Sequence, residues 1–366
     1  MKNKSITSCF LILFLGIILT AYGCMDNPEY YDTSDYITLE KIDAHVHINA
    51  ANPLLITLGL ENNMRLITIN TDAWGVYTVT DQENTALELI AGYPGQLAYI
   101  ASFSMDGWEN QEYWQKKTIE DLSASIEKGA SGVKVWKNIG LVLKDQAGEF
   151  LMIDDPVLDP VFDFIATQGL PLYGHIGEPR NTWLPLEEMT VAQDYNYFVD
   201  HPQYHMYQHP EYPSYDQIIE ARNNMLDKNP NLVFIGCHLG SMEWSIEMMS
   251  EHLDRYPNMI YDMAHRVPHL QFLAQKNRDL VRDFFIRYQD RLIYSTDLQL
   301  YDDSDPDEFA SLTRNTWKED WEFFVTDNEM DNFQFEGSFT GLKLPKSAID
   351  KLYLENVRKW VPLAGF

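Results

Sequence analysis

KIDAHVHINA, residues 41–50, begins as a hydrophobic strand and carries His45 and His47 two residues apart. Side chains at positions i and i+2 of a strand point to the same face of the sheet. Both imidazoles are therefore expected to meet in one space, and Asp43 precedes them at the same spacing. The pattern predicts that this space either holds a metal ion or is a polar pocket lined by two histidines.

Seven more strand-like segments follow, and each of the eight precedes a segment of helical periodicity. The expected strands span residues 41–49, 64–70, 96–104, 132–140, 170–179, 232–240, 258–266 and 291–299. The expected helices span residues 53–63, 85–95, 112–129, 155–169, 214–230, 241–257, 269–290 and 345–361. Short, mostly apolar strands are typical of a parallel sheet buried on both faces. Eight strand–helix units predict an α/β fold, a (β/α)8 TIM barrel. A doubly wound open sheet is the alternative, although no GxGxxG motif follows any strand.

Two connections are too long for simple turns: residues 180–213 after the fifth strand and residues 300–344 after the eighth. Both follow strands, so they lie on the face where barrel active sites are built. Their aromatic content predicts ordered long loops that form a lid or a pocket wall. The wall candidates are Trp183, Tyr204, Tyr207 and Tyr212. Three histidines spaced four residues apart in the first connection are interrupted by prolines, so we interpret them as part of a loop rather than a second metal site. They are His201, His205 and His209.

The composition is that of a globular chain with a large core and an acidic surface. Of 366 residues, 45% are hydrophobic and 13% aromatic, and the net charge is −28. Such a surface repels phosphate backbones, so nucleic acid is not an expected partner. A small-molecule substrate is expected instead, and the sequence does not determine the oligomeric state.

The N-terminus has the features of an export signal. MKNK is followed by an apolar run over residues 9–21, which is shorter than the roughly 20 residues that a membrane-spanning helix needs. AYGC at 21–24 resembles a bacterial lipoprotein box. We predict a signal peptide over residues 1–23, a tether over 24–40 and a single barrel domain over 41–366. A lipid on Cys24 would anchor the exported protein in the cell envelope and would be its only membrane contact. Periplasmic location or secretion without a lipid, and a retained N-terminal anchor, are the alternatives.

Polar groups occupy the ends of several expected strands, where an ordinary barrel has Val, Ile or Leu. They are His45 and His47 on the first strand, Lys134 on the fourth, His175 on the fifth, His238 on the sixth and Asp297 on the eighth. Any one histidine alone is more often a hydrogen-bonded structural residue. Together at corresponding positions, imidazoles and a carboxylate favour Zn²⁺ or a neighbouring transition metal, with one position left open for water.

This ordered set resembles the amidohydrolase superfamily, and within it the amidohydrolase-related (amidohydrolase 2) branch of metal-dependent TIM-barrel hydrolases and decarboxylases. The matching stretches are DAHVH (43–47), GVKVWKNIG (132–140), YGHIGEP (173–179), IGCHLGS (235–241) and YSTDLQ (294–299). They extend over nearly all of the chain that would remain after processing. The HxH pair alone is a weak signal, whereas the ordered set is specific.

The resemblance implies a role for each strand-end residue. His45 and His47 would ligate a divalent metal ion, with His175 as a third ligand. Asp297 would ligate the ion or deprotonate its water, and His238 would hydrogen-bond the substrate or stabilise its developing charge. We expect one Zn²⁺, with Mn²⁺ as the alternative.

Lys134 lies on the inward face of the fourth strand, with Trp136 and Asn138. In the two-metal members of the superfamily, a lysine on this strand is carbamylated and bridges both ions, whereas the single-metal branch does not require it as a ligand. We therefore expect Lys134 to be a cation that faces the substrate. A lysine paired with a carboxylate of the barrel is the structural alternative.

Five further residues carry weaker expectations. Glu178, Arg180 and Arg266 follow the fifth and seventh strands and are predicted to contact the substrate, because a guanidinium can hold a carboxylate. Each arginine could equally form a surface ion pair. Lys137 is expected to point outward, and Cys237 to face the surrounding helices as a core residue.

The function predicted from these residues is a metal-dependent hydrolase. An activated water would attack the carbonyl of an ester, lactone or amide of a small, possibly carbohydrate-derived, acid, with Asp297 moving the proton and His238 stabilising the oxyanion. A metal-dependent non-oxidative decarboxylase is the rival enzyme. A binding protein that has lost catalysis is a third reading, which the complete ligand set disfavours.

Overall fold

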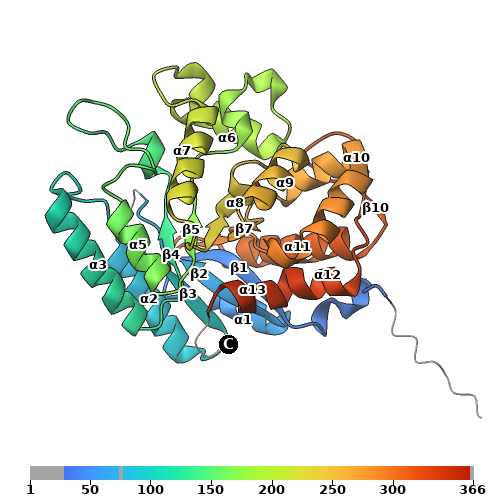
Figure 1. Ribbon diagram of the computed structural model, residues 1–366. Helices are drawn as coiled ribbons and strands as arrows, with labels where there is room; N and C mark the ends of the chain where they lie inside the picture. Colours follow the sequence, from blue (N-terminus) through green and yellow to red (C-terminus); the bar gives the residue numbers. More distant parts are fainter. Residues whose placement is uncertain (1–28, 74–76, 363–366) are drawn as a thin grey trace, which may run out of the picture.

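A closed ring of parallel strands forms the centre of the computed structural model, which describes residues 29–73 and 77–362 (Figure 1). The strands are β1 (Lys41–Ile48), β2 (Met64–Ile69), β3 (Leu97–Ser102), β4 (Val133–Val135), β5 (Leu172–Gly174), β6 (Phe234–Gly236), β7 (Met259–Asp262), β8 (Leu292–Ile293) and β9 (Gln299–Leu300). Within the described ranges their order is β8-β7-β6-β5-β4-β3-β2-β1-β9. The chain runs from β8 into β9, and β9 pairs in parallel with β1, which closes the ring. The predicted (β/α)8 barrel is confirmed.

Helices follow the strands and surround the ring, as Figure 1 shows. The longer ones are α1 (Leu54–Glu61), α2 (Val79–Gly92), α3 (Gln111–Glu127), α5 (Asp159–Thr167), α6 (Ala192–Asp200), α7 (Tyr215–Lys228), α9 (Ile246–Arg255), α10 (Val267–Arg287) and α11 (Pro306–Val325). The shorter ones are α4 (Asn138–Leu141), α8 (Cys237–Gly240), α12 (Lys346–Asp350) and α13 (Asn356–Trp360), and β10 (Glu329–Met330) pairs with β11 (Phe339–Thr340).

Strand alternation divides the core into two parts. Inside the ring, isoleucines from several strands pack together, among them Ile67, Ile100, Ile235 and Ile260. Outside it, residues such as Val133 pack against the helices in a larger cluster. Because apolar side chains fill the inside of the barrel, polar groups at the strand ends can meet only at its mouth.

The long loop predicted after the eighth strand is wrong for residues 306–325, which form α11. Trp317 and Trp321 of this helix are fully buried against the barrel. The helical signal was present in the sequence, since Phe309, Thr313, Trp317 and Trp321 recur every four residues and are all buried. The acidic composition of the segment concealed it. The connection after β5 is likewise not a bare loop, because it contains α6 and several short 3-10 turns.

The tether predicted over residues 24–40 is wrong for residues 29–40, which fold onto the barrel. Residues 33–37 form a 3-10 turn, and Tyr36 is buried. The Tyr31 hydroxyl donates to Asp350 Oδ1 at 2.8 Å, and Trp321 Nε1 donates to the carbonyl of Asp32 at 3.1 Å. Aromatic side chains in an otherwise acidic segment supply the apolar contact that holds it in place.

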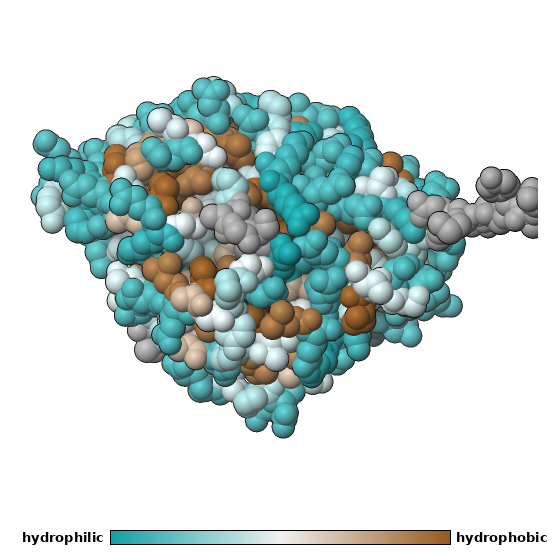
Figure 2. Space-filling view, turned by 90° about the horizontal axis from the view of Figure 1, so that it is seen from below, coloured by the Kyte–Doolittle hydropathy of each residue, from teal (hydrophilic) through white to brown (hydrophobic). Residues whose placement is uncertain are grey.

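The predicted signal peptide and the lipidation site at Cys24 lie outside the described residues, and both stay predictions. Within the described ranges, no helix combines the length and the apolar character needed to cross a membrane. Figure 2 views the molecule from below and shows apolar residues in separate patches among hydrophilic ones.

Candidate metal centre and active site

Three side chains converge at the barrel mouth where β1 meets the segment between β8 and β9. The Nε2 atoms of His45 and His47 are 3.3 Å apart. Asp297 Oδ1 lies 3.5 Å from the first and 3.2 Å from the second. The backbone holds the group in place, because the Asp297 N–H donates to the carbonyl of His45 at 2.8 Å. The predicted meeting of both imidazoles is therefore present, and Asp297 joins them.

The hydrogen bonds of the two rings show what the space between them can hold. His47 Nδ1 lies 2.7 Å from the carbonyl of Ile69, and His45 Nδ1 lies 2.7 Å from Asp262 Oδ2. Both partners can only accept, so each Nδ1 carries the proton and each Nε2 presents a lone pair. Asp297 Oδ1 is buried and receives no hydrogen bond. Three acceptors without a donor between them form a site for a cation.

The spacing suits a transition metal. Two nitrogens each about 2.1 Å from one ion in tetrahedral geometry lie about 3.4 Å apart, close to the 3.3 Å between His45 and His47. Burial lowers the pKa of His45, which keeps the imidazole neutral, as a ligand must be. Burial opposes the ionisation of Asp297, but His265, which lies 3.8 Å from its Oδ2, helps to hold the pKa of this carboxyl well below the ordinary value.

Asp262, the last residue of β7, orients His45 and was not identified from the sequence. Its Oδ2 accepts from His45 Nδ1, and its Oδ1 accepts from the His238 N–H at 2.7 Å. Burial alone would raise the pKa of Asp262, but the contact with His45, which donates a hydrogen bond to it, and the charge of Lys134 help to lower it to about 2. A carboxylate behind a ligand histidine fixes the ring and its tautomer. The signal in the sequence that could have identified Asp262 is its position at the end of an expected strand, like that of Asp297.

His175 and His238 form a second imidazole pair beside this group. His238 Nδ1 donates to the carbonyl of Ala264 at 2.8 Å, so its Nε2 is an acceptor, 3.1 Å from His175 Nδ1. His175 Nε2 is buried and has no hydrogen-bond partner. Among the described residues, the close set of ligand atoms comprises His45, His47 and Asp297 and does not include His175. The ligand role of His175 stays a prediction.

Left-handed backbone shapes the mouth of the barrel. His238, Leu239 and Ser241 have φ of 59°, 57° and 59°, and Asp297 has φ of 66°. Non-glycine residues adopt this conformation at a cost, and it occurs most often at functional sites. In this barrel, it turns His238 over the strand end and directs Asp297 toward β1.

Cys237 does not face the helices, contrary to the prediction. It is fully buried in the apolar cluster inside the barrel, and its Sγ accepts from Lys134 Nζ at 3.0 Å. The prediction continued strand alternation through His238, but β6 ends at Gly236 and the left-handed turn begins two residues later. Cys237 and His238 can therefore both point inward. Lys134 faces the interior as predicted.

A cavity of about 520 Å³ opens above these groups, and His47, Lys134, His175, His238 and Asp297 all line it. Its wall includes two further residues that the sequence analysis selected, Glu178 and Arg266.

The prediction that Lys137 points outward is wrong. Lys137 lines the cavity and forms an ion pair with Glu178, because β4 ends at Val135 and alternation no longer applies. Arg180 does not line the cavity, and its guanidinium lies over Tyr215 at 4.9 Å from the ring centroid; its contact with the substrate stays a prediction.

His265 lines the cavity and was not identified from the sequence. It has φ of 59°, is about half exposed and lies 3.8 Å from Asp297 Oδ2.

The predicted aromatic wall is formed in part. Tyr204 and Tyr212 line a smaller pocket of about 330 Å³ beside the main cavity. Trp183 packs in its own loop and donates to the carbonyl of Pro213 at 3.1 Å, and Tyr207 is largely exposed. The three loop histidines each bond to a backbone carbonyl of that connection, as expected for a loop. They are His201, His205 and His209.

Comparison with known families agrees with this geometry. The family model described as "Amidohydrolase" matches residues 42–363, nearly the whole described barrel. The chain belongs to the amidohydrolase family. Enzymes of this family are hydrolases or decarboxylases that use a divalent metal and act on small molecules. Comparison with curated proteins gives no match.

Solved structures with a similar fold include two decarboxylases. A 5-carboxyvanillate decarboxylase from Novosphingobium aromaticivorans, complexed with manganese, has 12% identity and a TM-score of 0.48, over 92% of this chain and 99% of that one. A 2,6-dihydroxybenzoate decarboxylase from Rhizobium has 15% identity and a TM-score of 0.43, over 75% and 92%.

A Pseudomonas putida protein assigned as a 2-pyrone-4,6-dicarboxylic acid hydrolase has 13% identity and a TM-score of 0.45, over 88% of this chain and 97% of that one. At such low identity, these three likenesses do not bear on the substrate of this amidohydrolase.

Proposed function

We propose that this amidohydrolase is a metal-dependent hydrolase that cleaves an ester, lactone or amide of a small acid with water. The observation that carries the proposal is that the Nε2 atoms of His45 and His47 and Oδ1 of Asp297 lie within 3.5 Å of one another, while the Nδ1 atom of each ring is engaged with another acceptor. This group lies at the edge of a cavity large enough for a small organic molecule.

We assign one divalent ion to this group, Zn²⁺ ahead of Mn²⁺, because imidazole-rich ligand sets favour zinc. His45, His47 and Asp297 would hold it, with His175 beside them. When bound, the ion would lower the pKa of a coordinated water and polarise the substrate carbonyl. A second close group, His45, Cys237 and Asp262, reuses His45, and Lys134 already contacts its sulfur atom. This supports one ion rather than two.

The proton is handled by Asp297 and His238. Asp297 accepts a proton from the attacking water and passes it to the leaving group. His238 donates through Nδ1 to Ala264, so its Nε2 is available as an acceptor and not as a donor. We therefore assign His238 to accept or relay a proton, in place of the oxyanion contact predicted from the sequence, which would require a hydrogen on Nε2.

The acid part of the substrate would be held by basic residues of the cavity. Arg266 is 7% exposed, and its Nε is buried without a partner. Lys134 is 1% exposed at the floor of the cavity. Two cations at the centre of a strongly acidic protein offset its field where hydrolysis would release the acid as a carboxylate.

The same two cations keep the decarboxylase alternative open. Lys134 and Arg266 could hold a carboxylate that is lost as carbon dioxide rather than one that is retained. Hydrolysis consumes one water per turnover and places its oxygen in the product, whereas decarboxylation releases carbon dioxide without net water consumption. Incorporation of labelled water oxygen, measured beside carbon dioxide release, separates the two reactions.

The test uses full-length protein loaded with Zn²⁺ and a panel of esters and lactones of small acids. Asp297→Asn should lower kcat/KM by about 10²- to 10⁴-fold, the usual contribution of a positioned acid–base group. The matched control, Asp303→Asn, changes an exposed carboxylate. Unchanged activity in Asp297→Asn would overturn the proposal.

Metal content gives a second readout that does not depend on activity. Elemental analysis should find one ion per chain, and the double variant His45→Ala, His47→Ala should lose it. Two ions per chain would instead support a carbamylated Lys134 that bridges them, and no ion would remove the basis of the enzyme assignment.

A further inference from the structure

Two side pockets open from the cavity at the metal centre. The first, the aromatic lobe, has a volume of about 330 Å³ and shares Trp136, Lys137 and Glu178 with the central cavity. The second, the amide lobe, has a volume of about 700 Å³ and shares His265 and Asp297 with it. The three spaces therefore adjoin one another across the barrel mouth, and together we call them the cleft.

The two lobes lie on opposite sides of the metal centre. The aromatic lobe is built from residues that follow β4 and β5, such as Trp136 and Glu178. The amide lobe is built mostly from the segment between β8 and β9, the start of α10, and α11, with Gln193 of α6 and residues 332–334 completing its wall. In the closed ring, β4 and β8 are four strands apart. In a barrel of eight strands, that separation places them across the axis from each other.

Flat side chains dominate the aromatic lobe. Its wall contains five rings, from Trp136, Phe150, Tyr197, Tyr204 and Tyr212. The ring centroids of Phe150 and Tyr212 are 5.1 Å apart. The rings of Tyr197 and Tyr204 are nearly parallel, with an interplanar angle of 11°.

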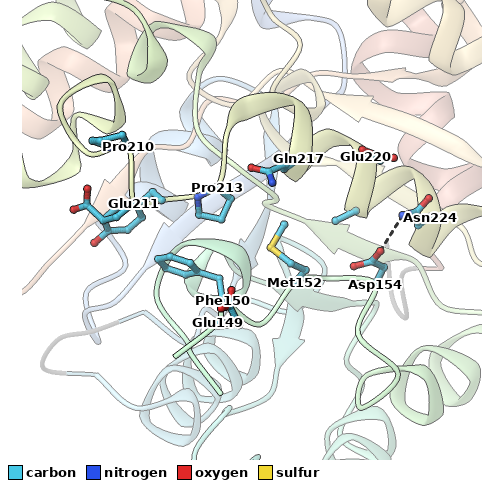
Figure 3. Close-up of a pocket in the computed structure, with 12 residues that line it drawn as sticks. Glu149, Phe150, Met152, Asp154, Pro210, Glu211, Pro213, Gln217, Glu220 and Asn224 are labelled. Carbon is cyan, nitrogen blue, oxygen red and sulfur yellow. Dashed lines mark hydrogen bonds between the residues drawn. The ribbon is translucent and has the colours of Figure 1, made fainter. Parts of the chain in front are cut away.

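Phe150 and Tyr212 also line an outer cavity of about 500 Å³, which lies between residues 149–154 and 210–224 (Figure 3). They form the wall between the two spaces. A surface of aromatic rings is complementary to a flat, aromatic group.

The amide lobe has the opposite chemistry. Amide side chains recur in its wall: Gln193, Gln271, Gln299, Asn315, Asn332 and Gln334. Among the described residues that line it, none is Lys or Arg, so it offers no cation to an anionic ligand. Leu312 and Phe333 form an apolar part of its wall and are 56% and 88% exposed. Amides that both donate and accept, beside apolar side chains, suit an uncharged, hydroxyl-rich group.

We propose that the substrate spans this cleft as an ester of an aromatic acid with a hydroxyl-rich, sugar-like alcohol, which rests on the hydrolase function proposed above. The aromatic acyl part occupies the aromatic lobe and the alcohol part occupies the amide lobe. Asp297 lines both the central cavity and the amide lobe, so it can protonate the leaving alcohol. Water adds across the acyl C–O bond: the acid takes the hydroxyl and the alcohol takes the hydrogen. Loss of carbon dioxide, a three-atom product, would leave the second lobe without a role.

The kinetic test compares two benzoate esters, 1-O-benzoyl-glucose and methyl benzoate, with the full-length, Zn²⁺-loaded protein. The double variant Leu312→Ala, Phe333→Ala should lower the ratio of kcat/KM for the glucose ester to that for the methyl ester by about tenfold, as expected for lost apolar contact. Leu280→Ala and Tyr113→Ala are controls, because these exposed residues belong to α10 and α3 and lie outside the lobe walls. An unchanged ratio in the double variant would overturn the amide-lobe assignment.

The aromatic lobe is tested with the acyl group. Tyr204→Ala should lower the ratio of kcat/KM for 1-O-benzoyl-glucose to that for 1-O-acetyl-glucose by about tenfold. A ratio equal to that of Tyr113→Ala would overturn the aromatic-lobe assignment.

Calorimetry separates the failure of this inference from the failure of the hydrolase proposal. Benzoate and methyl glucoside are titrated into wild type and variants, and no turnover is needed. If no ester is cleaved but each fragment binds and loses affinity in the variant of its own lobe, the assignment of the two lobes is supported and the hydrolase proposal is wrong. If esters are cleaved but no variant changes a ratio or a fragment affinity, the hydrolase proposal is supported and the assignment of the lobes is wrong.

Discussion

At the scale of single residues, the site depends on where protons can lie. His45 and His47 each donate a hydrogen bond from Nδ1 to a fixed acceptor. The lone pairs on their Nε2 atoms therefore face each other and Asp297 Oδ1. Such an arrangement is repulsive unless a cation is shared. Asp262, which sets the tautomer of His45, therefore matters as much as the ligand that it orients.

Replacing Asp262 tests this orienting role. Asp262→Asn should weaken Zn²⁺ binding by about 10- to 100-fold, because His45 loses the carboxylate that fixes its ring. Metal affinity is measured by competition with a chelator, and circular dichroism checks that the fold is kept. Asp121→Asn, at an exposed carboxylate of α3, is the control. Equal affinity in both variants would contradict the role given to Asp262.

A second buried carboxyl, Asp320 of α11, predicts a pH dependence of stability. Burial raises its pKa from 3.8 to about 8, with the nearby Asp43 adding to the effect and the hydrogen bond from Tyr294 opposing it. The folded state thus keeps a proton that the unfolded state releases above about pH 4. The stabilising contribution is complete below that pH and is lost as the pH rises through 8.

The change Asp320→Asn should remove this dependence, because the amide stays neutral and can still accept from Tyr294. The free energy of unfolding of the wild type should fall relative to that of the variant between pH 4 and 8. Chemical denaturation at several pH values measures it, with Asp163→Asn on the exposed face of α5 as control. Parallel curves for wild type and Asp320→Asn would show that Asp320 does not titrate in this window.

At the scale of elements, departures from regular strand geometry bring the site together. The pairing of β1 with β2 shifts register between Asp43 and Val46, so Asp43 reaches Trp317 of α11 while both histidines reach the mouth. A hydrogen bond from α7 stabilises the left-handed turn after β6: the buried Arg222 donates to the carbonyl of Gly240. Regular alternation would not place these side chains together.

Gly174, which ends β5 just before His175, has no room for a larger side chain. A Cβ there would lie 2.2 Å from Cε2 of Phe234. Gly174→Ala should therefore destabilise the protein by about 1–3 kcal/mol through overpacking and lower activity by displacing His175. Gly92→Ala, at the end of α2 with nothing within 4 Å, should be neutral or slightly stabilising. Thermal unfolding of both variants measures the difference, and equal melting temperatures would refute it.

At the scale of the whole molecule, segments outside the barrel complete its outer wall. Residues 29–40 pack against α11, where Tyr36 and Tyr31 lie beside Trp321 with ring centroids 6.0 and 5.9 Å apart. Helix α11 in turn covers β1, where its Trp317 donates to Asp43. The N-terminal segment thus supports the strand that carries the two histidines.

Shortening the chain tests this support. A protein that starts at residue 41 should melt several degrees lower than one that starts at residue 29, because buried aromatic surface is lost. The point variant Tyr36→Ala should reproduce part of the loss, and Ile37→Ala, at a side chain that is 51% exposed, should not. Calorimetric melting of the four proteins decides the matter. Equal melting temperatures for the two truncated chains would contradict the role of this segment.

The sequence alone determined the barrel and the identity of its strand-end groups. Period-two and helical patterns are local, so eight strand–helix units, the convergence of His45 with His47, and the strand-end positions of Lys134, His175, His238 and Asp297 could all be predicted. The helix α11 was also encoded, in the four-residue spacing of its buried residues, but its acidic composition is also typical of a loop.

Only the tertiary structure decided how these groups face one another. Cys237 and Lys137 were placed on the wrong side because strands end and turn where neighbouring elements require it. Asp262 and His265 contact site residues that are far away in the chain, and the guanidinium of Arg180 lies over Tyr215 rather than in the cavity. A side chain's direction beyond a strand end, its proton and the cleft that it lines depend on packing between distant segments, and no local pattern in the sequence records that packing.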